Sequence, residues 1–423
     1  MFLAVVFGMF FVMLSMAEMA SMAPTAGGQF FWVSEFAPRQ YQKVLSYTVG
    51  WFCVLGWQSA LVLTAYSVAQ QVEALISLCD VDYTIRGWQG TLLTMPITLF
   101  AIMLNTLLAR RLPILQNIAF ALHTAGFFVL IAVFWALGPH NDPAIVLSDF
   151  SETTGWSSVG LACLVSLVGP INTLVGADSS CHLSEELVNA SYVLPRAMLT
   201  TAIINYTMGF VMTITLMLNL GDVATALASP TGQPYVQVLL DVTGSKGAAI
   251  TLTALVCVLL LVCTVNGVTT SSRQLFAFAL RPGWDIPVNA VLVTMAITSI
   301  LSLIIIGSSV AFSVLMSLSL PGLLSSYWIV ITVIFAKRFR KEPFPKSQFN
   351  LGRFGWLANG IALAWLTLVY VMMFFPSAPY PDVAGMNWSV LIYCCVIVCF
   401  GTFYYFKARH RYAGPVALVK QDI

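Results

Sequence analysis

The chain has 423 residues, of which 59% are hydrophobic and 9% are charged, against about 25% charged residues in ordinary soluble domains. A soluble protein has no interior for this many long apolar runs, so we predict an all-α polytopic membrane protein. The formal net charge is +2 and the charges are scattered, which argues against nucleic acid as a partner.

Histidine and cysteine show no spacing typical of a metal site or a disulfide framework. The four histidines are dispersed, and the nine cysteines lie mostly inside apolar runs. No pair of acids inside the predicted spans suggests catalysis. We therefore expect no metal, no cofactor and no enzymatic activity.

Eleven apolar segments are long enough to cross about 30 Å of hydrocarbon. They follow one another without a separate soluble region, so we predict one transmembrane domain over residues 1–423. The predicted spans are 1–17, 44–75, 89–108, 114–137, 155–178, 198–219, 247–266, 287–306, 310–335, 355–375 and 388–406.

The orientation follows from Lys and Arg, which favour cytoplasmic loops. If the segment after Phe406 lies inside, alternation leaves only Arg86 and Lys246 of the 19 basic residues outside. We therefore expect a cytoplasmic C-terminus. The N-terminus then lies outside, and Met1 opens the first span directly, so we expect a preceding span to be absent from this chain. The alternative is a genuine eleven-span protein.

The span 155–178 contains two helix-breaking sequences, Gly169-Pro170 and Val175-Gly176-Ala177-Asp178. Proline removes a backbone donor and glycine relaxes the helix. A helix that is interrupted at bilayer depth beside an acid is typical of a transporter binding site. A proline-kinked structural helix is the alternative.

Other polar residues stand out inside spans. Glu18 closes the first span, and a Pro-Gly turn then leads to a short aromatic helix near residues 30–36. Gln58 follows Trp57 at mid-depth of the second span. Glu73 lies near the outer end of that span, where we expect it to reach water.

Several segments resemble one family. They are SMAEMASMAPTAGGQFFWVSEFAP (15–38), HLSEELVNASYVLPRAM (182–198), SSRQLFAFA (271–279) and SLSLPGLLSSYWI (317–329). Together they resemble fungal amino acid, choline and γ-aminobutyrate permeases of the amino acid–polyamine–organocation superfamily. The resemblance covers nearly the whole chain.

This resemblance implies the LeuT-like five-plus-five inverted-repeat fold, whose first and sixth helices are unwound at mid-membrane. The fifth span here corresponds to the family's sixth helix, and the family's first helix has no counterpart. Gly176-Ala177-Asp178 matches the unwound tripeptide, whose amides hold a substrate carboxylate and whose acid serves gating or proton sensing. Gln58 aligns with a substrate-contacting position, and Asn172 stands where relatives usually carry an aromatic residue.

From the residues and the resemblance we predict a substrate site and a coupling site. The coupling or gating residues are Asp178 and Glu18. The substrate site consists of Gly169, Asn172, Thr173, Gly176, Ala177, Asp178, Gln58 and Trp57.

The predicted function is secondary active transport by alternating access. The substrate is an amino acid, γ-aminobutyrate, choline or a polyamine, and coupling to protons is favoured over sodium. The alternative is a transport-inactive membrane protein that acts as a sensor or partner of other permeases. The sequence does not separate the plasma membrane from the vacuolar membrane, and the oligomeric state stays open.

Overall fold

The computed structural model describes residues 1–80, 82–148, 155–279, 288–307, 310–382, 385–412 and 414–415. Every regular element within these ranges is helical, which confirms the all-α prediction. The long helices are α1 (Phe2–Met22), α3 (Arg39–Cys79), α4 (Gly87–Leu107), α5 (Leu112–Leu137), α9 (Ala190–Leu218), α12 (Lys246–Ala279), α13 (Val288–Leu303), α14 (Val310–Phe339), α15 (Phe354–Met372) and α16 (Ser389–Phe403).

Short helices connect and interrupt the long ones. They are α2 (Gln29–Phe36), η1 (Ala109–Arg111), α6 (Pro143–Ser148), α7 (Val159–Val165), α8 (Val168–Leu174), η2 (Ala177–Glu186), α10 (Val223–Leu227), α11 (Pro234–Thr243), η3 (Ile304–Gly307), η4 (Tyr404–Ala408) and α17 (Arg409–Arg411).

Ten helical segments in the described ranges are long and apolar enough to cross a membrane, and Ala290–Leu303 is a shorter apolar helix. Each of these segments overlaps one of the eleven predicted spans, with different bounds, and the segment at the predicted span 287–306 is the shorter helix. The longest is α3, whose 41 residues rise about 60 Å at 1.5 Å per residue. It therefore extends beyond the hydrocarbon at one or both ends.

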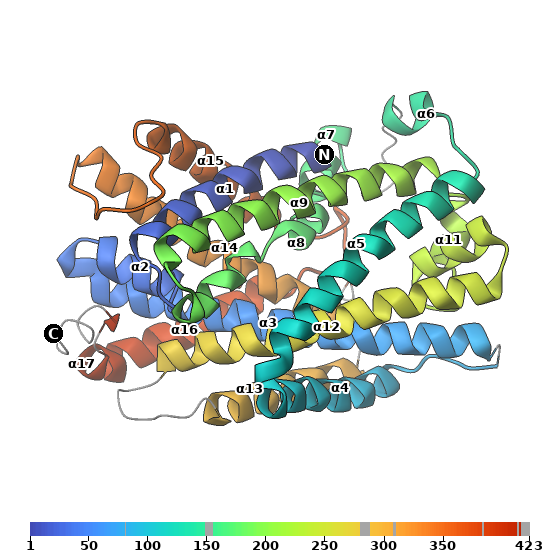
Figure 1. Cartoon of the computed structure of the whole chain (residues 1–423), viewed down its shortest axis with the longest axis horizontal. Coiled ribbons are helices and arrows are strands. Elements are labelled where there is room, and N and C mark those ends of the chain that lie inside the picture. Colours follow the sequence, from blue (N-terminus) through green and yellow to red (C-terminus); the bar gives the residue numbers. More distant parts are fainter. Residues whose placement is uncertain are drawn as a thin grey trace.

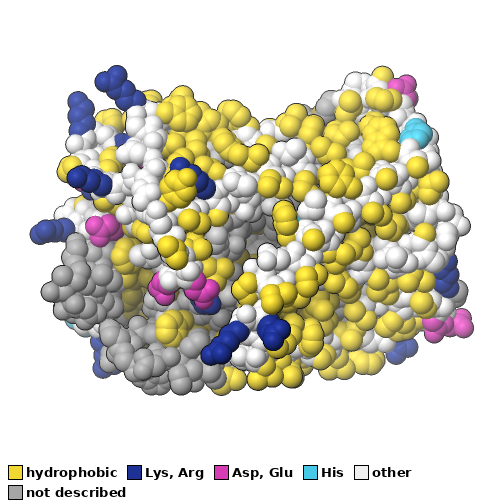
Figure 2. Space-filling model, viewed as in Figure 1, with side chains coloured by type: hydrophobic (Ala, Val, Ile, Leu, Met, Phe, Trp, Pro, Cys, Tyr) yellow, Lys and Arg dark blue, Asp and Glu magenta, His cyan; other side chains and the backbone are white. Residues whose placement is uncertain are grey.

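The long helices lie roughly along the longest axis of the molecule (Figure 1), with α2 and α17 at one end and α6 and α11 at the other. Figure 2 shows hydrophobic side chains over the middle of this face, whereas Lys and Arg gather toward the end of α2 and α17. This distribution fits a bilayer that lies across the long axis.

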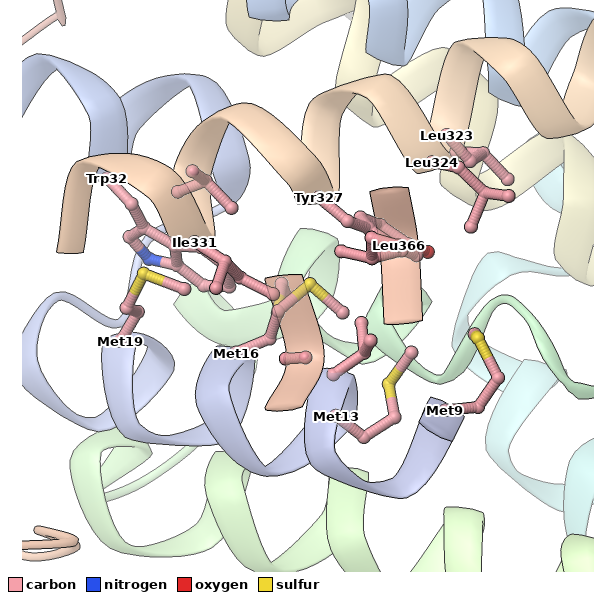
Figure 3. Close-up of a cluster of buried hydrophobic side chains, with 14 of the residues drawn as sticks. Met9, Met13, Met16, Met19, Trp32, Leu323, Leu324, Tyr327, Ile331 and Leu366 are labelled. Carbon is pink, nitrogen blue, oxygen red and sulfur yellow. The ribbon is translucent and has the colours of Figure 1, made fainter. Parts of the chain in front are cut away.

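A large buried cluster joins α1, α14 and α15. Met9, Met13, Met16 and Met19 are all fully buried on one face of α1, at the i, i+4, i+7 spacing that places residues together on a helix. They face Ile331 and Tyr327 of α14 and Leu366 of α15 (Figure 3). The unbranched thioether side chain fills irregular gaps, so this face packs α1 against two helices at once.

The backbones of α3 and α14 touch at two glycines. A Cβ atom on Gly322 would lie 2.6 Å from the backbone nitrogen of Gly56, which is too close for any other residue. Small residues allow such close helix approach in membranes. The contact holds α14 against α3 five residues before Tyr327, which belongs to the site described below.

Glu73 differs from expectation, because its side chain is only 2% exposed. Helix α3 continues to Cys79, one turn beyond the predicted end of the span, and α4 packs against this extension. A Cβ atom on Gly90 of α4 would lie 3.3 Å from Oε2 of Glu73. The glycine thus lets α4 cover the carboxyl group that we expected in water.

Candidate functional site at the interrupted helix

The fifth predicted span is interrupted twice. A turn at Ser166 and Leu167 separates α7 from α8, and an unwound segment at Val175 and Gly176 separates α8 from η2. The second interruption lies where the sequence indicates it. The first lies just before Gly169-Pro170, so Pro170 falls in the first turn of α8. Proline is tolerated there, because the N–H that it lacks would have no partner in the first turn of a helix.

Gly176 forms the second interruption. Its φ is +109°, in the region that residues with a Cβ atom rarely adopt. After it the chain re-enters helical geometry at Ala177, and Asp178 is placed directly at the start of the new helix. The local sequence therefore turns a membrane-spanning rod into two half-helices with an acid at their junction.

The Asp178 carboxylate is fully buried and is held by two side chains from distant elements. The Tyr327 hydroxyl of α14 donates to Oδ1 at 2.5 Å, and the Gln29 amide at the start of α2 donates to Oδ2 at 2.5 Å. Burying a carboxylate is costly unless such donors replace its water. Asp178 thus joins η2 to α2 and α14, and each of its two partners lies 149 positions from it in the sequence.

Aromatic side chains surround this junction. The tip of the Trp57 ring in α3 lies 3.8 Å from the position that a Cβ atom on Gly176 would take. The ring also meets His182 of η2 edge-on, with 5.8 Å between ring centroids. On the α9 side, the Tyr206 hydroxyl donates to the Leu174 carbonyl at 3.1 Å, which fixes the last turn of α8.

The structure brings four predicted site residues together: Trp57, Gly176, Ala177 and Asp178. The other residues of α8 lie differently. Gly169 is exposed with nothing within 4 Å of its Cβ position. Thr173 is also exposed, and its hydroxyl donates to the Pro170 carbonyl at 2.7 Å. Asn172 is half-buried between them.

Gln58 belongs to a different interface. Its amide nitrogen donates to the Thr294 hydroxyl of α13 at 3.0 Å and to the Ser271 carbonyl of α12 at 3.5 Å. Neighbouring residues on a helix point about 100° apart, so Trp57 faces the interrupted helix while Gln58 faces α12 and α13. The structure does not place Gln58 beside Asp178.

Glu18 lies in a second polar cluster, at the C-terminal end of α1. Its carboxylate, 2% exposed, forms an ion pair with Arg338 of α14 and accepts a hydrogen bond from the Leu351 amide at 2.9 Å. Arg338 also donates to the Gly352 carbonyl at 3.1 Å. We call Glu18, Arg338, Leu351 and Gly352 the Glu18 cluster. It ties α1, α14 and the segment before α15 together.

Sequence reasoning did not identify Gln29 and Tyr327 as partners of Asp178. Both lie inside motifs that carry the family resemblance, Gln29 in SMAPTAGGQ and Tyr327 in LSSYW. The signal that could have identified them is that each is a polar residue in a segment that packs against the helix that carries Asp178. Within the described ranges, no group of three His, Cys, Asp or Glu side chains is arranged to hold a metal ion.

The known relatives of this chain include a transporter and a permease. The chain is 28% identical to the choline transporter of Saccharomyces cerevisiae over 91% of this chain and 69% of the relative. It is 24% identical to an amino-acid permease of Arabidopsis thaliana over 96% of this chain and 83% of the relative.

A solved structure of a mutant manganese transporter from Eremococcus coleocola aligns with 100% of this chain and 88% of that chain, with a TM-score of 0.56. At 14% identity, this likeness shows only the shared fold. The family comparison is more specific, because the amino acid permease family matches residues 1–402. The resemblance seen in the sequence is confirmed, and the chain belongs to the amino acid permease family.

Proposed function

We propose that this permease carries an amino acid or a related amine across the membrane by alternating access, coupled to protons through Asp178. The candidate substrates are amino acids, γ-aminobutyrate, choline and polyamines. Family membership supports amine or amino acid transport in general. The geometry at the interrupted helix supports the more specific mechanism.

The observation that carries the proposal is the fully buried Asp178 at the junction of α8 and η2. The carboxylate can meet a solute only when Gln29, Tyr327 or both release it. Those residues lie on α2 and α14, so loading the site requires movement between helices. Such movement around a fixed junction is what alternating access needs.

The substrate carboxylate, where there is one, would meet the backbone amides at the start of η2, from Gly176 to Asp178. Unpaired amides and the helix dipole favour an anion there by about 0.3–2 kcal/mol. The amine would face carbonyl groups at the end of α8, around Asn172, and the ring of Trp57. A cation over an aromatic ring gains about 0.5–2 kcal/mol, depending on its desolvation.

Glu18 would act in gating through its ion pair with Arg338. The Glu18 cluster joins the ends of α1 and α14 at the end where Lys and Arg gather in Figure 2, which we assign to the cytoplasm. Opening toward that side requires α1 and α14 to separate, and therefore requires the ion pair to break. The plasma membrane and the vacuolar membrane are both compatible with this orientation.

The test is uptake and equilibrium binding by the purified chain in lipid vesicles, with a panel of labelled amino acids, γ-aminobutyrate, choline and a polyamine. Asp178→Asn should abolish proton-driven uptake of the accepted substrate. The matched control Asp222→Asn changes an exposed acid that caps α10, and should leave uptake unchanged.

Unaltered proton-driven uptake by Asp178→Asn would contradict coupling through this residue. Binding by the unmodified chain without uptake would instead favour the sensor or partner function.

A further inference from the structure

His182 lies one helical turn after Asp178 and is 1% exposed. Its Nδ1 atom is 2.8 Å from the Ala26 carbonyl oxygen. A carbonyl can only accept a hydrogen bond, so Nδ1 must carry the hydrogen. In the neutral ring the other nitrogen, Nε2, is then a bare acceptor. One contact thus fixes the tautomer of the side chain.

The bare nitrogen is buried and has no hydrogen-bond partner within the part of the chain that the structure describes. Leaving a buried acceptor unpaired costs about 1–3 kcal/mol, so such a group calls for an explanation. The same is true of its neighbour Trp57, whose buried Nε1–H has no acceptor among the described residues. The two rings meet edge-on with centroids 5.8 Å apart.

We propose, on the basis of the transport function proposed above, that His182 accepts the coupling proton from Asp178 at Nε2 and passes it toward the end of the molecule where the Glu18 cluster lies. His182 is thereby a second coupling residue. Trp57 covers the ring and shields it from the substrate side.

The proton balance of this step is simple. The O–H bond of the protonated Asp178 carboxyl breaks and an N–H bond forms at Nε2 through a bridging water, because no oxygen of Asp178 lies within hydrogen-bond distance of Nε2. The product is an imidazolium whose Nδ1–H still donates to Ala26. The carboxylate that is left is stabilised by the Tyr327 hydroxyl and the Gln29 amide, which already point at its two oxygens. Release of the proton from Nε2 to water on the side of the Glu18 cluster restores the starting tautomer.

The charged groups around His182 fit this role. Asp178 on the same element favours a proton on the ring, whereas Arg273 of α12 opposes it, and the Arg273 charge is itself paired with Glu186 at 2.5 Å. Residues 25–29, which pack over the ring, contain no titratable side chain. On the other faces, α3 contributes Trp57, and α9 contacts the adjacent Cys181 through Met198. Asp178 is therefore the acid whose charge acts on the imidazole.

The decisive variant is His182→Asn. The amide nitrogen of asparagine occupies the position of Nδ1, so it can keep the hydrogen bond to Ala26, but it offers no basic nitrogen. We expect substrate binding and substrate–substrate exchange within about twofold of wild type. Proton-driven accumulation should fall at least about tenfold, and the pH dependence of uptake should flatten. Proton-driven accumulation with an unchanged pH profile in His182→Asn would overturn the inference.

A second measurement does not depend on a variant at position 182. The other histidines, His123, His140 and His410, are exposed and can be replaced, so nitrogen NMR then reports His182 alone. We expect an Nδ1–H tautomer that gains a proton at Nε2 as the pH falls between about 8 and 5, with a midpoint that changes in Asp178→Asn. An Nε2–H tautomer, or no titration in that range, would contradict the inference.

The two measurements separate this inference from the function on which it rests. A chain that transports no member of the substrate panel, but shows titration at Nε2, contradicts the proposed transport function. The other outcome is proton-coupled transport in which Nε2 does not titrate and the His182→Asn variant accumulates substrate as wild type does. That outcome contradicts only the role of His182.

Discussion

At the scale of single residues, two buried acids have opposite surroundings. Asp178 is held by neutral donors, the Tyr327 hydroxyl and the Gln29 amide. Glu18 is held by a full positive charge on Arg338 and by the Leu351 amide. A carboxylate that is held only by neutral groups can change its protonation without leaving a buried cation unpaired. This difference supports the proposed proton coupling through Asp178 and the proposed gating role of Glu18.

The ion pair gives a prediction for stability. Glu18→Gln leaves Arg338 without a counter-charge in a site where the arginine side chain is 10% exposed. Breaking a buried pair in this way costs about 3–5 kcal/mol, so thermal unfolding in detergent should move to clearly lower temperature.

The matched control is Glu342→Gln, because Glu342 pairs with Arg340 at 2.6 Å but is 41% exposed. Exposed pairs contribute little, so this variant should unfold close to wild type. Equal unfolding temperatures for both variants would show that the Glu18 cluster is not a stabilising contact.

The residue-scale site was only partly predictable. Asp178 and Gly176 could be found because an acid and a glycine in an apolar run are local signals. The partners Gln29 and Tyr327 come from tertiary packing 149 residues away, which no local pattern encodes. For Gln58, the sequence predicted the depth in the span but not the direction of the side chain. That direction depends on the packing of α12 and α13.

At the scale of elements, the junction between α8 and η2 depends on the backbone of Gly176. At φ +109°, a residue with a Cβ atom costs about 1–3 kcal/mol. The space itself is not the obstacle, since the nearest atom to a Cβ there would be 3.8 Å away, in Trp57. Gly176→Ala should therefore reduce transport and lower stability through backbone strain alone.

The control for this prediction is Gly160→Ala in α7, where no atom lies within 4 Å of the Cβ position. Alanine favours helix over glycine by about 1 kcal/mol, so this variant should be neutral or slightly stabilising. Thermal unfolding and uptake check both variants. A Gly176→Ala protein with wild-type values would mean that the interruption survives without the left-handed conformation.

The contact between α3 and α14 gives a second prediction at this scale. Gly322→Ala would place a Cβ atom 2.6 Å from the Gly56 nitrogen and 2.9 Å from the Phe52 carbonyl oxygen. Both are backbone atoms, which cannot relieve the clash by a change of rotamer, so the helices must move apart. This movement lowers the free energy of unfolding by about 1–3 kcal/mol.

We expect Gly322→Ala to unfold at lower temperature, and to weaken the Tyr327–Asp178 contact one helical turn away. Gly401→Ala in α16, with nothing within 4 Å of the Cβ position, is the control in a comparable apolar helix. Identical stability of the two variants would argue against the close approach of α3 and α14.

Element boundaries show why sequence reasoning placed spans better than interruptions. Apolar length identified the ten described segments that are long enough to cross a membrane, because hydrocarbon thickness fixes the minimum length of a crossing helix. The predicted span 287–306 corresponds only to the shorter apolar helix Ala290–Leu303. The turn at residues 166–167 was placed too late, since proline was expected to end a helix and instead lies in the first turn of the next one. The true end of α3, and with it the burial of Glu73, depends on contact with α4.

At the scale of the whole molecule, composition alone determined the class of protein, because a soluble protein has no interior in which to bury so many apolar runs. The arrangement of the helices was predicted from the family resemblance, and the structural likeness to a solved transporter over 100% of this chain, with a TM-score of 0.56, confirms the fold. The methionine face of α1 in Figure 3 could not have been predicted from periodicity, since apolar residues occur all around that helix. Packing against α14 and α15 selects the buried face.

The account rests on the claim that a transported amine or amino acid binds at the backbone junction between α8 and η2. Hydrogen–deuterium exchange of the peptide that spans residues 168–186, with and without a saturating transported substrate, tests it most directly. We predict slower exchange of the amides around Gly176 to Ser179 in the presence of substrate, and no change in α5. Unchanged exchange at the junction, in a sample shown to have bound substrate, would contradict the account.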